Sequence, residues 1–223
     1  METAMDKSTK VIHDDLGNNL FWTRTVNQGD VSEAFKQSHI VEEITLDFAR
    51  HTGVTLETRA IVADWDSSEE RMTIYHNGQA PHMMQSIIAK HLNISEGLVR
   101  IISCDVGGSF GIKVHVYPDE MVTVAVSKLL KRPVKFVADR LESYSTDIHS
   151  RCHKISGKIG VDDKGKILAF EIDDLSGIGP FSVYPRTSAI ETNQVLNLSA
   201  ASYVVPNYKA KGTVVFQNKT PMC

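Results

Sequence analysis

The segment from Asp105 to Lys113 restricts the fold of this chain more than any other, because it places glycines and one aromatic residue between a strand and a helix. It reads Asp-Val-Gly-Gly-Ser-Phe-Gly-Ile-Lys. Residues 98–104 before it are mostly apolar and predict a strand, and residues 118–130 after it have the apolar spacing of a helix. Proteins use a strand, a glycine-rich loop and a helix in this order to bring backbone amides close to a ligand.

Two familiar phosphate-binding motifs do not match this loop. A Walker loop needs Gly-Lys followed by a hydroxyl residue, but an isoleucine separates Gly111 from Lys113, and Val114 stands where the hydroxyl belongs. A Rossmann fingerprint needs a glycine where this chain has Val106. A tight connection without a ligand stays an alternative. Phe110 favours a ligand, because a flat ring among glycines suits a loop that presses against a bound molecule.

Four motifs follow one another along the chain. They are Thr55-Leu56-Glu57-Thr58, then Gln79-Ala80-Pro81-His82, then the loop from Val106 to Lys113, and last Lys131 to Phe136 with Asp139-Arg140. In this order and spacing, over about residues 12–223, they resemble the large subunits of the molybdenum hydroxylases, which include xanthine dehydrogenase, aldehyde oxidase and aerobic carbon monoxide dehydrogenase. Those subunits carry a Leu-Glu-Thr strand, a Gln before Pro-His at a helix start, a Gly-Gly-Gly-Phe-Gly-Gly-Lys loop and an Arg-Pro-Val strand.

The resemblance implies a molybdenum–molybdopterin cofactor, in the plain or the cytosine dinucleotide form. Gln79 would donate a hydrogen bond to an oxygen ligand of the metal, and Phe110 would pack beside the metal, without a covalent side-chain ligand. Such donors act through their fixed orientation in a dry site. The implied cofactor-binding residues are Gln79, Gly107, Gly108, Ser109, Phe110 and Gly111.

The loop departs from the commoner family pattern in three places. Ser109 and Ile112 replace glycines, which makes the loop stiffer and bulkier. Val114 stands where xanthine-oxidising members carry a glutamate. We expect Val114 to contact the substrate and a purine to be a poor one. The pattern is closer to the carbon monoxide dehydrogenase-like branch, whose members oxidise varied small molecules.

The resemblance also implies an activity and partners. The enzyme would oxidise or hydroxylate a small carbon substrate with oxygen from water, and electrons would pass to iron–sulfur clusters and FAD on partner chains. No residue matches the family's catalytic glutamate, so we expect no catalytic residue here and no activity without the remaining part of the large subunit. Two alternatives stay open: a non-catalytic fragment or assembly subunit, and a phosphate- or nucleotide-binding module.

Composition excludes several classes of protein. With 223 residues, 42% of them hydrophobic, the chain can bury a core, and its net charge of −3 offers no attraction for nucleic acid. Its three cysteines lack the CxxC spacing of metal or redox sites. No run approaches the roughly 20 apolar residues of a membrane helix. We therefore expect a cytoplasmic protein with no membrane insertion.

The predicted architecture is α+β, with mixed, mostly antiparallel sheets covered by helices. Residues 1–28 look like a linker, and residues 29–223 are expected to form the cofactor-binding domain or its first part. The predicted helices are 29–37, 81–92, 118–130 and 188–198. The predicted strands are 40–48 paired with 54–62, then 71–76, 98–104, 133–138, a hairpin of 154–161 with 166–175, and 208–216.

Overall fold

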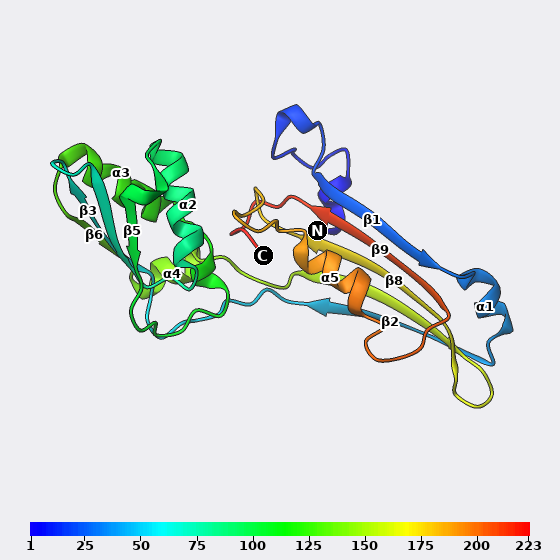
Figure 1. Cartoon of the computed structure of the whole chain (residues 1–223). Helices are drawn as coiled ribbons and strands as arrows, with labels where there is room; N and C mark the ends of the chain where they lie inside the picture. The colour runs from blue at the N-terminus through cyan, green and yellow to red at the C-terminus, as the bar shows by residue number, and fades with distance from the viewer. The chain divides into compact units, whose positions relative to one another are not determined.

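The computed structural model describes all 223 residues, which form two compact units. Unit 1 comprises Met1–His51 and Ile148–Cys223, and unit 2 comprises Thr52–Asp147. Each unit contains one sheet and its own helices (Figure 1). The predicted α+β class with mostly antiparallel strand pairing is confirmed.

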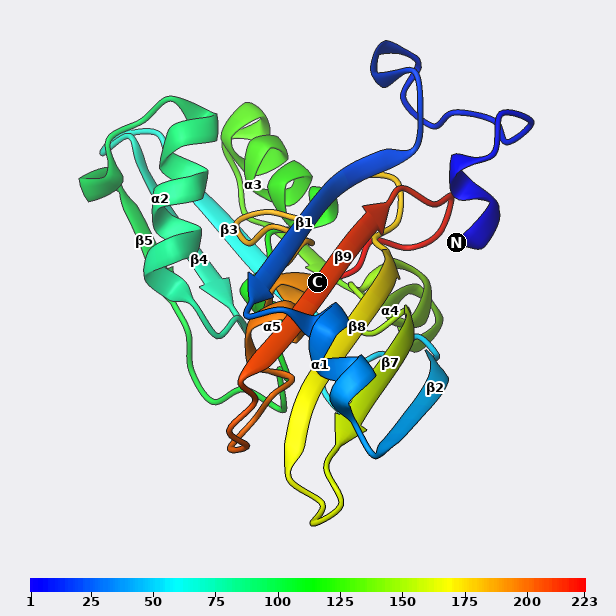
Figure 2. The ribbon, with the colours of Figure 1, turned by 90° about the vertical axis from the view of Figure 1, so that its right-hand side faces the viewer.

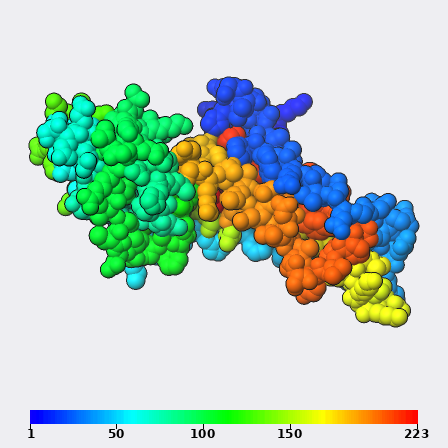
Figure 3. All heavy atoms as spheres, in the orientation of Figure 1, coloured from blue at the N-terminus to red at the C-terminus, as the bar shows by residue number.

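The sheet of unit 1 has five strands in the order β1-β9-β8-β7-β2, seen side by side in Figure 2. The strands are β1 (Leu20–Gln28), β2 (Ile40–Phe48), β7 (His153–Val161), β8 (Ile167–Gly177) and β9 (Asn207–Val215). Only β8 and β9 run parallel. The predicted hairpin is present as β7 and β8, and its turn projects as the yellow tip in Figure 3. Asp162 stabilises this turn, because its carboxylate accepts from the backbone amides of Lys164 and Lys166 at 2.9 and 2.8 Å.

Two α-helices belong to unit 1: α1 (Val31–Gln37) and α5 (Ile190–Leu198). Helix α1 begins at Asp30, whose side chain accepts from the backbone amide of Glu33 at 3.0 Å, as the capping pattern predicts. Helix α5 packs on β9, β1 and β8, and its fully buried Leu196 lies in the core between helix and sheet. Short 3-10 turns occur at Glu2–Met5 and Asp14–Leu16.

The sheet of unit 2 has four strands in the order β5-β4-β3-β6. The strands are β3 (Ala60–Asp66), β4 (Arg71–His76), β5 (Val99–Ile102) and β6 (Val134–Val137). The helices are α2 (Pro81–Leu92), α3 (Pro118–Leu130) and α4 (Arg140–Thr146), with 3-10 turns at Glu96–Leu98 and Ile112–Val114. Both α2 and α3 begin with proline. Proline suits the first helical position because the N–H that it lacks would have no partner within the helix there.

Both long helices of unit 2 cover the same face of its sheet. Ile61 and Ile74 from the sheet, Ile88 from α2 and Val124 from α3 are almost completely buried in one apolar cluster. Successive side chains of a strand point to opposite faces of the sheet. Tyr75, which follows Ile74, therefore points away from α2 and α3, and it is 52% exposed. The core therefore fixes α2 and α3, together with the segments that precede them.

Three expectations about local structure were wrong. Residues 20–28 of the supposed linker form β1 along β9, where apolar Trp22 and Val26 pack against the α5 side of the sheet. Strand 40–48 pairs with β7 and not with residues 54–62. In the predicted strand 54–62, residues 54–59 lie outside the sheet, because β3 begins only at Ala60. Helix α4 was not predicted.

Candidate functional site

The glycine loop presents an exposed aromatic ring on a strained backbone. Phe110 has φ +50°, in the left-handed region that residues other than glycine seldom adopt, and its side chain is 77% exposed. Gly108 and Gly111 on either side have φ +97° and +88°. A ring held this way adds nothing to the core of unit 2. It is therefore available to contact a ligand.

The Leu-Glu-Thr motif, expected as a strand, holds the loop instead. The carboxylate of Glu57 accepts from the backbone amide of Gly107 and from the ammonium group of Lys113, each at 2.8 Å, and the amide of Glu57 donates to the carbonyl of Gly107 at 3.2 Å. The hydrogen bond from buried Lys113 lowers the pKa of Glu57. A Cβ on Gly107 would lie 2.5 Å from that of Glu57, so only glycine fits this approach.

Gln79 lies directly beside the loop. Its backbone amide donates to the carbonyl of Lys113 at 3.2 Å, and its side-chain oxygen accepts from the hydroxyl of Ser109. The preceding Gly78 is buried, and a Cβ there would lie 2.3 Å from the ring of His76. The chain between the end of β4 and Gln79 therefore follows a path that the neighbouring side chains fix.

The structure thus brings most of the predicted site residues together. Gln79 and the loop residues Gly107, Gly108, Ser109, Phe110 and Gly111 form one continuous surface, here called the Gln79–loop surface. Val114 is half-buried at the end of the 3-10 turn, with its amide directed at the carbonyl of Gly111 at 3.4 Å. The contact of these residues with a cofactor or a substrate stays a prediction.

Sequence reasoning missed Arg59, a buried arginine that supports the Gln79–loop surface from inside unit 2. The guanidinium of Arg59 is fully buried and stacks 3.7 Å from the ring centre of Tyr117. The Tyr117 hydroxyl donates to the carbonyl of Ile112 at 2.9 Å, which links this cluster to the loop. The carboxylates around the guanidinium are those of Asp119 at 2.6 Å, Asp147 at 2.6 Å and Glu120 at 3.4 Å. No local sequence signal marks Arg59, because arginines are seldom fully buried.

Ion pairs also decide the roles of three carboxylates near the loop. Glu57 is paired with Lys113, while Asp119 and Glu120 are paired with Arg59. Glu120 in addition contacts His76 at 3.2 Å. Each carboxylate is held in a structural ion pair, so none of them is placed as a free general base.

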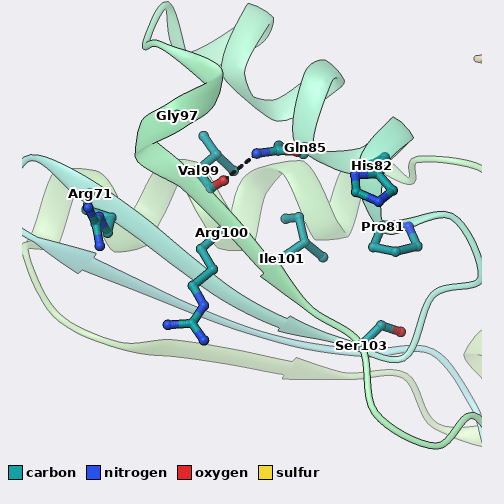
Figure 4. Close-up of a pocket in the computed structure, with 9 residues that line it drawn as sticks. All are labelled: Arg71, Pro81, His82, Gln85, Gly97, Val99, Arg100, Ile101 and Ser103. Carbon is teal, nitrogen blue, oxygen red and sulfur yellow. Dashed lines mark hydrogen bonds between the residues drawn. The ribbon is translucent and has the colours of Figure 1, made fainter.

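A separate cavity of about 500 Å³ lies between α2 and β5 (Figure 4). Within it the Gln85 side chain donates to the carbonyl of Val99 at 2.8 Å. Its lining residues are Arg71, Pro81, His82, Gln85, Gly97, Val99, Arg100, Ile101 and Ser103. None of the predicted site residues lines it, so the Gln79–loop surface is a different feature from this cavity.

No group of three or more His, Cys, Asp or Glu side chains converges in an arrangement that could hold a metal ion. No helix has both the length and the apolar character needed to cross a bilayer.

Comparison with known proteins decides the family. The molybdopterin cofactor-binding domain family matches residues 12–223. The chain belongs to this family. Among curated relatives, this molybdopterin cofactor-binding domain is 28% identical to the carbon monoxide dehydrogenase large chain of Hydrogenophaga pseudoflava, over 92% of its own length. It is 30% identical to the nicotinate dehydrogenase large molybdopterin subunit of Eubacterium barkeri, over 98% of its length.

Solved structures agree with this assignment. Quinoline 2-oxidoreductase from Pseudomonas putida 86 matches the whole domain with a TM-score of 0.94 at 25% identity, over 28% of its own chain. The domain covers 25% of the Hydrogenophaga relative and 50% of the Eubacterium relative. It therefore spans a quarter to half the length of these relatives, which are molybdenum-dependent oxidoreductases or their subunits.

Proposed function

We propose that this domain forms part of the large subunit of a molybdenum hydroxylase and holds the molybdopterin cofactor on the Gln79–loop surface. One observation carries the proposal: the side chain of Gln79 accepts a hydrogen bond from Ser109, the chain neighbour of Phe110, whose ring is exposed. A polar side chain and an exposed apolar ring on one backbone segment, which is fixed by Glu57, form a preorganised ligand surface.

The residues present fit such a cofactor. The ring of Phe110 offers an apolar face that shields a ligand from water, and Gln79 offers a side-chain amide to its oxygen atoms. When bound, molybdopterin supplies two-electron redox chemistry, and the protein supplies binding and orientation. The residues that would hold the cofactor are Gln79, Gly107, Gly108, Ser109, Phe110 and Gly111.

The substrate and the partners belong to the same proposal. The two curated relatives are named for oxidising carbon monoxide and nicotinate, which supports a small carbon substrate. Val114, at the end of the turn that follows the loop, is the proposed contact to that substrate. Electrons would pass to iron–sulfur clusters and FAD on partner subunits, and the rest of the large subunit would complete the site. The cofactor would be molybdopterin or its cytosine dinucleotide.

The structure disfavours a phosphate- or nucleotide-binding module. Such a module places its anion at the helix that follows the glycine loop. Here α3 carries Asp119 and Glu120 in its first turn, and the backbone amide of Tyr117 is directed at Glu120 at 3.3 Å. Carboxylates at this end of a helix repel an anion.

Dye reduction tests the proposed reaction. The chain would be produced with the polypeptides encoded beside it, and reduction of an artificial acceptor measured with small aldehydes and nitrogen heterocycles. We expect turnover from the complex, none from the chain alone, and at least a tenfold lower rate for Gln79→Ala, since one oriented donor contributes on the order of 100- to 1,000-fold. Gln37→Ala, an exposed glutamine on α1, is the matched control. Equal rates for Gln79→Ala and wild type would contradict the assignment.

A further inference from the structure

Ser109 occupies the centre of a closed set of hydrogen bonds between the loop and Gln79. Its hydroxyl oxygen accepts from the backbone amide of Lys113 at 3.2 Å and contacts the side-chain oxygen of Gln79. The carbonyl of Lys113 in turn accepts from the backbone amide of Gln79 at 3.2 Å. Both ends of Gln79 are thus held by one five-residue turn, from Ser109 to Lys113.

The direction of these bonds sets the orientation of the Gln79 amide. A serine hydroxyl has one proton to donate and two lone pairs that accept. The amide of Lys113 uses one lone pair of Ser109, and the hydroxyl proton is then donated to the oxygen of Gln79. The oxygen of Gln79 is thereby directed at the loop. Its nitrogen, which carries both protons, is left on the exposed side.

We infer that Ser109 is a positioning residue that fixes the Gln79 side chain with its amide nitrogen toward the ligand. This inference rests on the proposed function of the Gln79–loop surface. An amide free to turn would offer its oxygen about as often as its nitrogen, and an oxygen repels the oxygen atoms of a ligand. Ser109 stands at a position where the commoner loop of the family has glycine, which has no side chain to hold the amide.

Side-chain NMR of the 223-residue chain without cofactor tests the orientation. Ser109→Ala removes the hydroxyl, Ser109→Thr keeps it, and Gln79→Glu identifies the amide resonances. We expect Ser109→Ala to move the Cδ resonance of Gln79 upfield, because its carbonyl loses a hydrogen bond, and Ser109→Thr to leave it near the wild-type position. An unchanged Cδ in Ser109→Ala, or a change confined to Nε2, would overturn the inference, because the nitrogen would then face Ser109.

The loaded complex tests the consequence. We expect Ser109→Ala to keep its molybdenum content within about twofold of wild type while kcat falls about tenfold, and Ser109→Thr to restore most of the rate. A tenfold fall in kcat is the size expected for the loss of one hydrogen bond. An unchanged kcat in Ser109→Ala would show that Ser109 does not act through Gln79. A wild-type complex without molybdenum would refute the proposed function instead, and the NMR measurement would still decide the orientation.

Discussion

At the scale of single residues, the buried charges of unit 2 depend on the guanidinium of Arg59. Asp147 and Glu120 are almost fully buried, and both contact this group. Charged groups in an apolar interior are tolerated when paired, and removing one partner leaves the other uncompensated. The same cluster supports the loop through Tyr117.

We predict that Arg59→Met destabilises unit 2 by about 3–5 kcal/mol, the range for breaking a buried ion pair. Urea unfolding followed by the fluorescence of Trp65 measures this in a Trp22→Phe background, because these are the two tryptophans of the chain and only Trp65 lies in unit 2.

The matched control for Arg59 is Arg71→Met. Arg71 is half exposed and lies 3.7 Å from exposed Glu69. We expect a change within about 0.5 kcal/mol, because exposed ion pairs contribute little. Similar losses for both variants would show that the buried cluster has no special role in unit 2.

At the scale of elements, His153 connects the sheet of unit 1 to α5. Its ring lies 2.9 Å from Asp174 on β8 and 3.5 Å from Glu191 on α5. Burial alone would lower the pKa of His153, but hydrogen bonds to these two carboxylates outweigh it and raise the pKa to about 9. The imidazolium therefore holds strand and helix together near neutral pH.

We predict that unit 1 loses stability as the pH rises from about 6.5 to about 9. The folded pKa lies above the unfolded value, so the stabilisation is complete below the unfolded pKa near 6.5 and is lost as the pH passes the folded pKa. Thermal unfolding followed by Trp22 in a Trp65→Phe background should show Tm falling over this window.

His153→Gln is the control for this pH dependence. Glutamine can still donate to Asp174 but does not titrate, so we expect a lower Tm that changes less with pH over the same window. The same slope in wild type and His153→Gln would assign the pH dependence to other groups.

Elements marked by local signals could be predicted from the sequence. Helices α2 and α3 were predicted with their observed bounds, because a proline at the first position and apolar residues at helical spacing lie within the helix itself. Strand partners depend on distant segments, and the pairing of β2 with β7 across more than 100 residues carries no local signal. Residues 54–59 carry β-branched residues, yet Glu57 bonds to Gly107 instead of entering a sheet.

The candidate site was predicted in part for the same reason. Gln79 and Phe110 could be proposed as site residues because their motifs occur in a recognisable order, and the structure links Gln79 to Ser109, the residue before Phe110. The support beneath them, through Arg59 and the Glu57–Lys113 pair, arises only when the chain folds. The reason for Gly111 could not be read from the sequence. A Cβ at this position would meet nothing within 4 Å, so glycine is required by the φ of +88° and not by a close contact inside the chain.

At the scale of the whole molecule, the domain corresponds to only a part of the relatives that it matches. It spans a quarter of the Hydrogenophaga relative, and the carboxylates of Glu57, Asp119 and Glu120 near its loop are engaged in ion pairs. We therefore expect the general base and the remaining cofactor contacts to come from the rest of the large subunit. Cofactor retention reports on the Gln79–loop surface without requiring turnover.

The most direct test is the molar ratio of molybdenum to protein in the purified complex, for wild type, Gly108→Val and the control Gly97→Val. A Cβ on Gly108 would lie 3.1 Å from the ring of Phe110 on a backbone with φ +97°, whereas Gly97 has an ordinary φ and its nearest atom is 3.8 Å away. The account predicts about one molybdenum per chain for wild type and Gly97→Val, with a several-fold loss for Gly108→Val. No molybdenum in the wild-type complex, or equal content in all three, would contradict it.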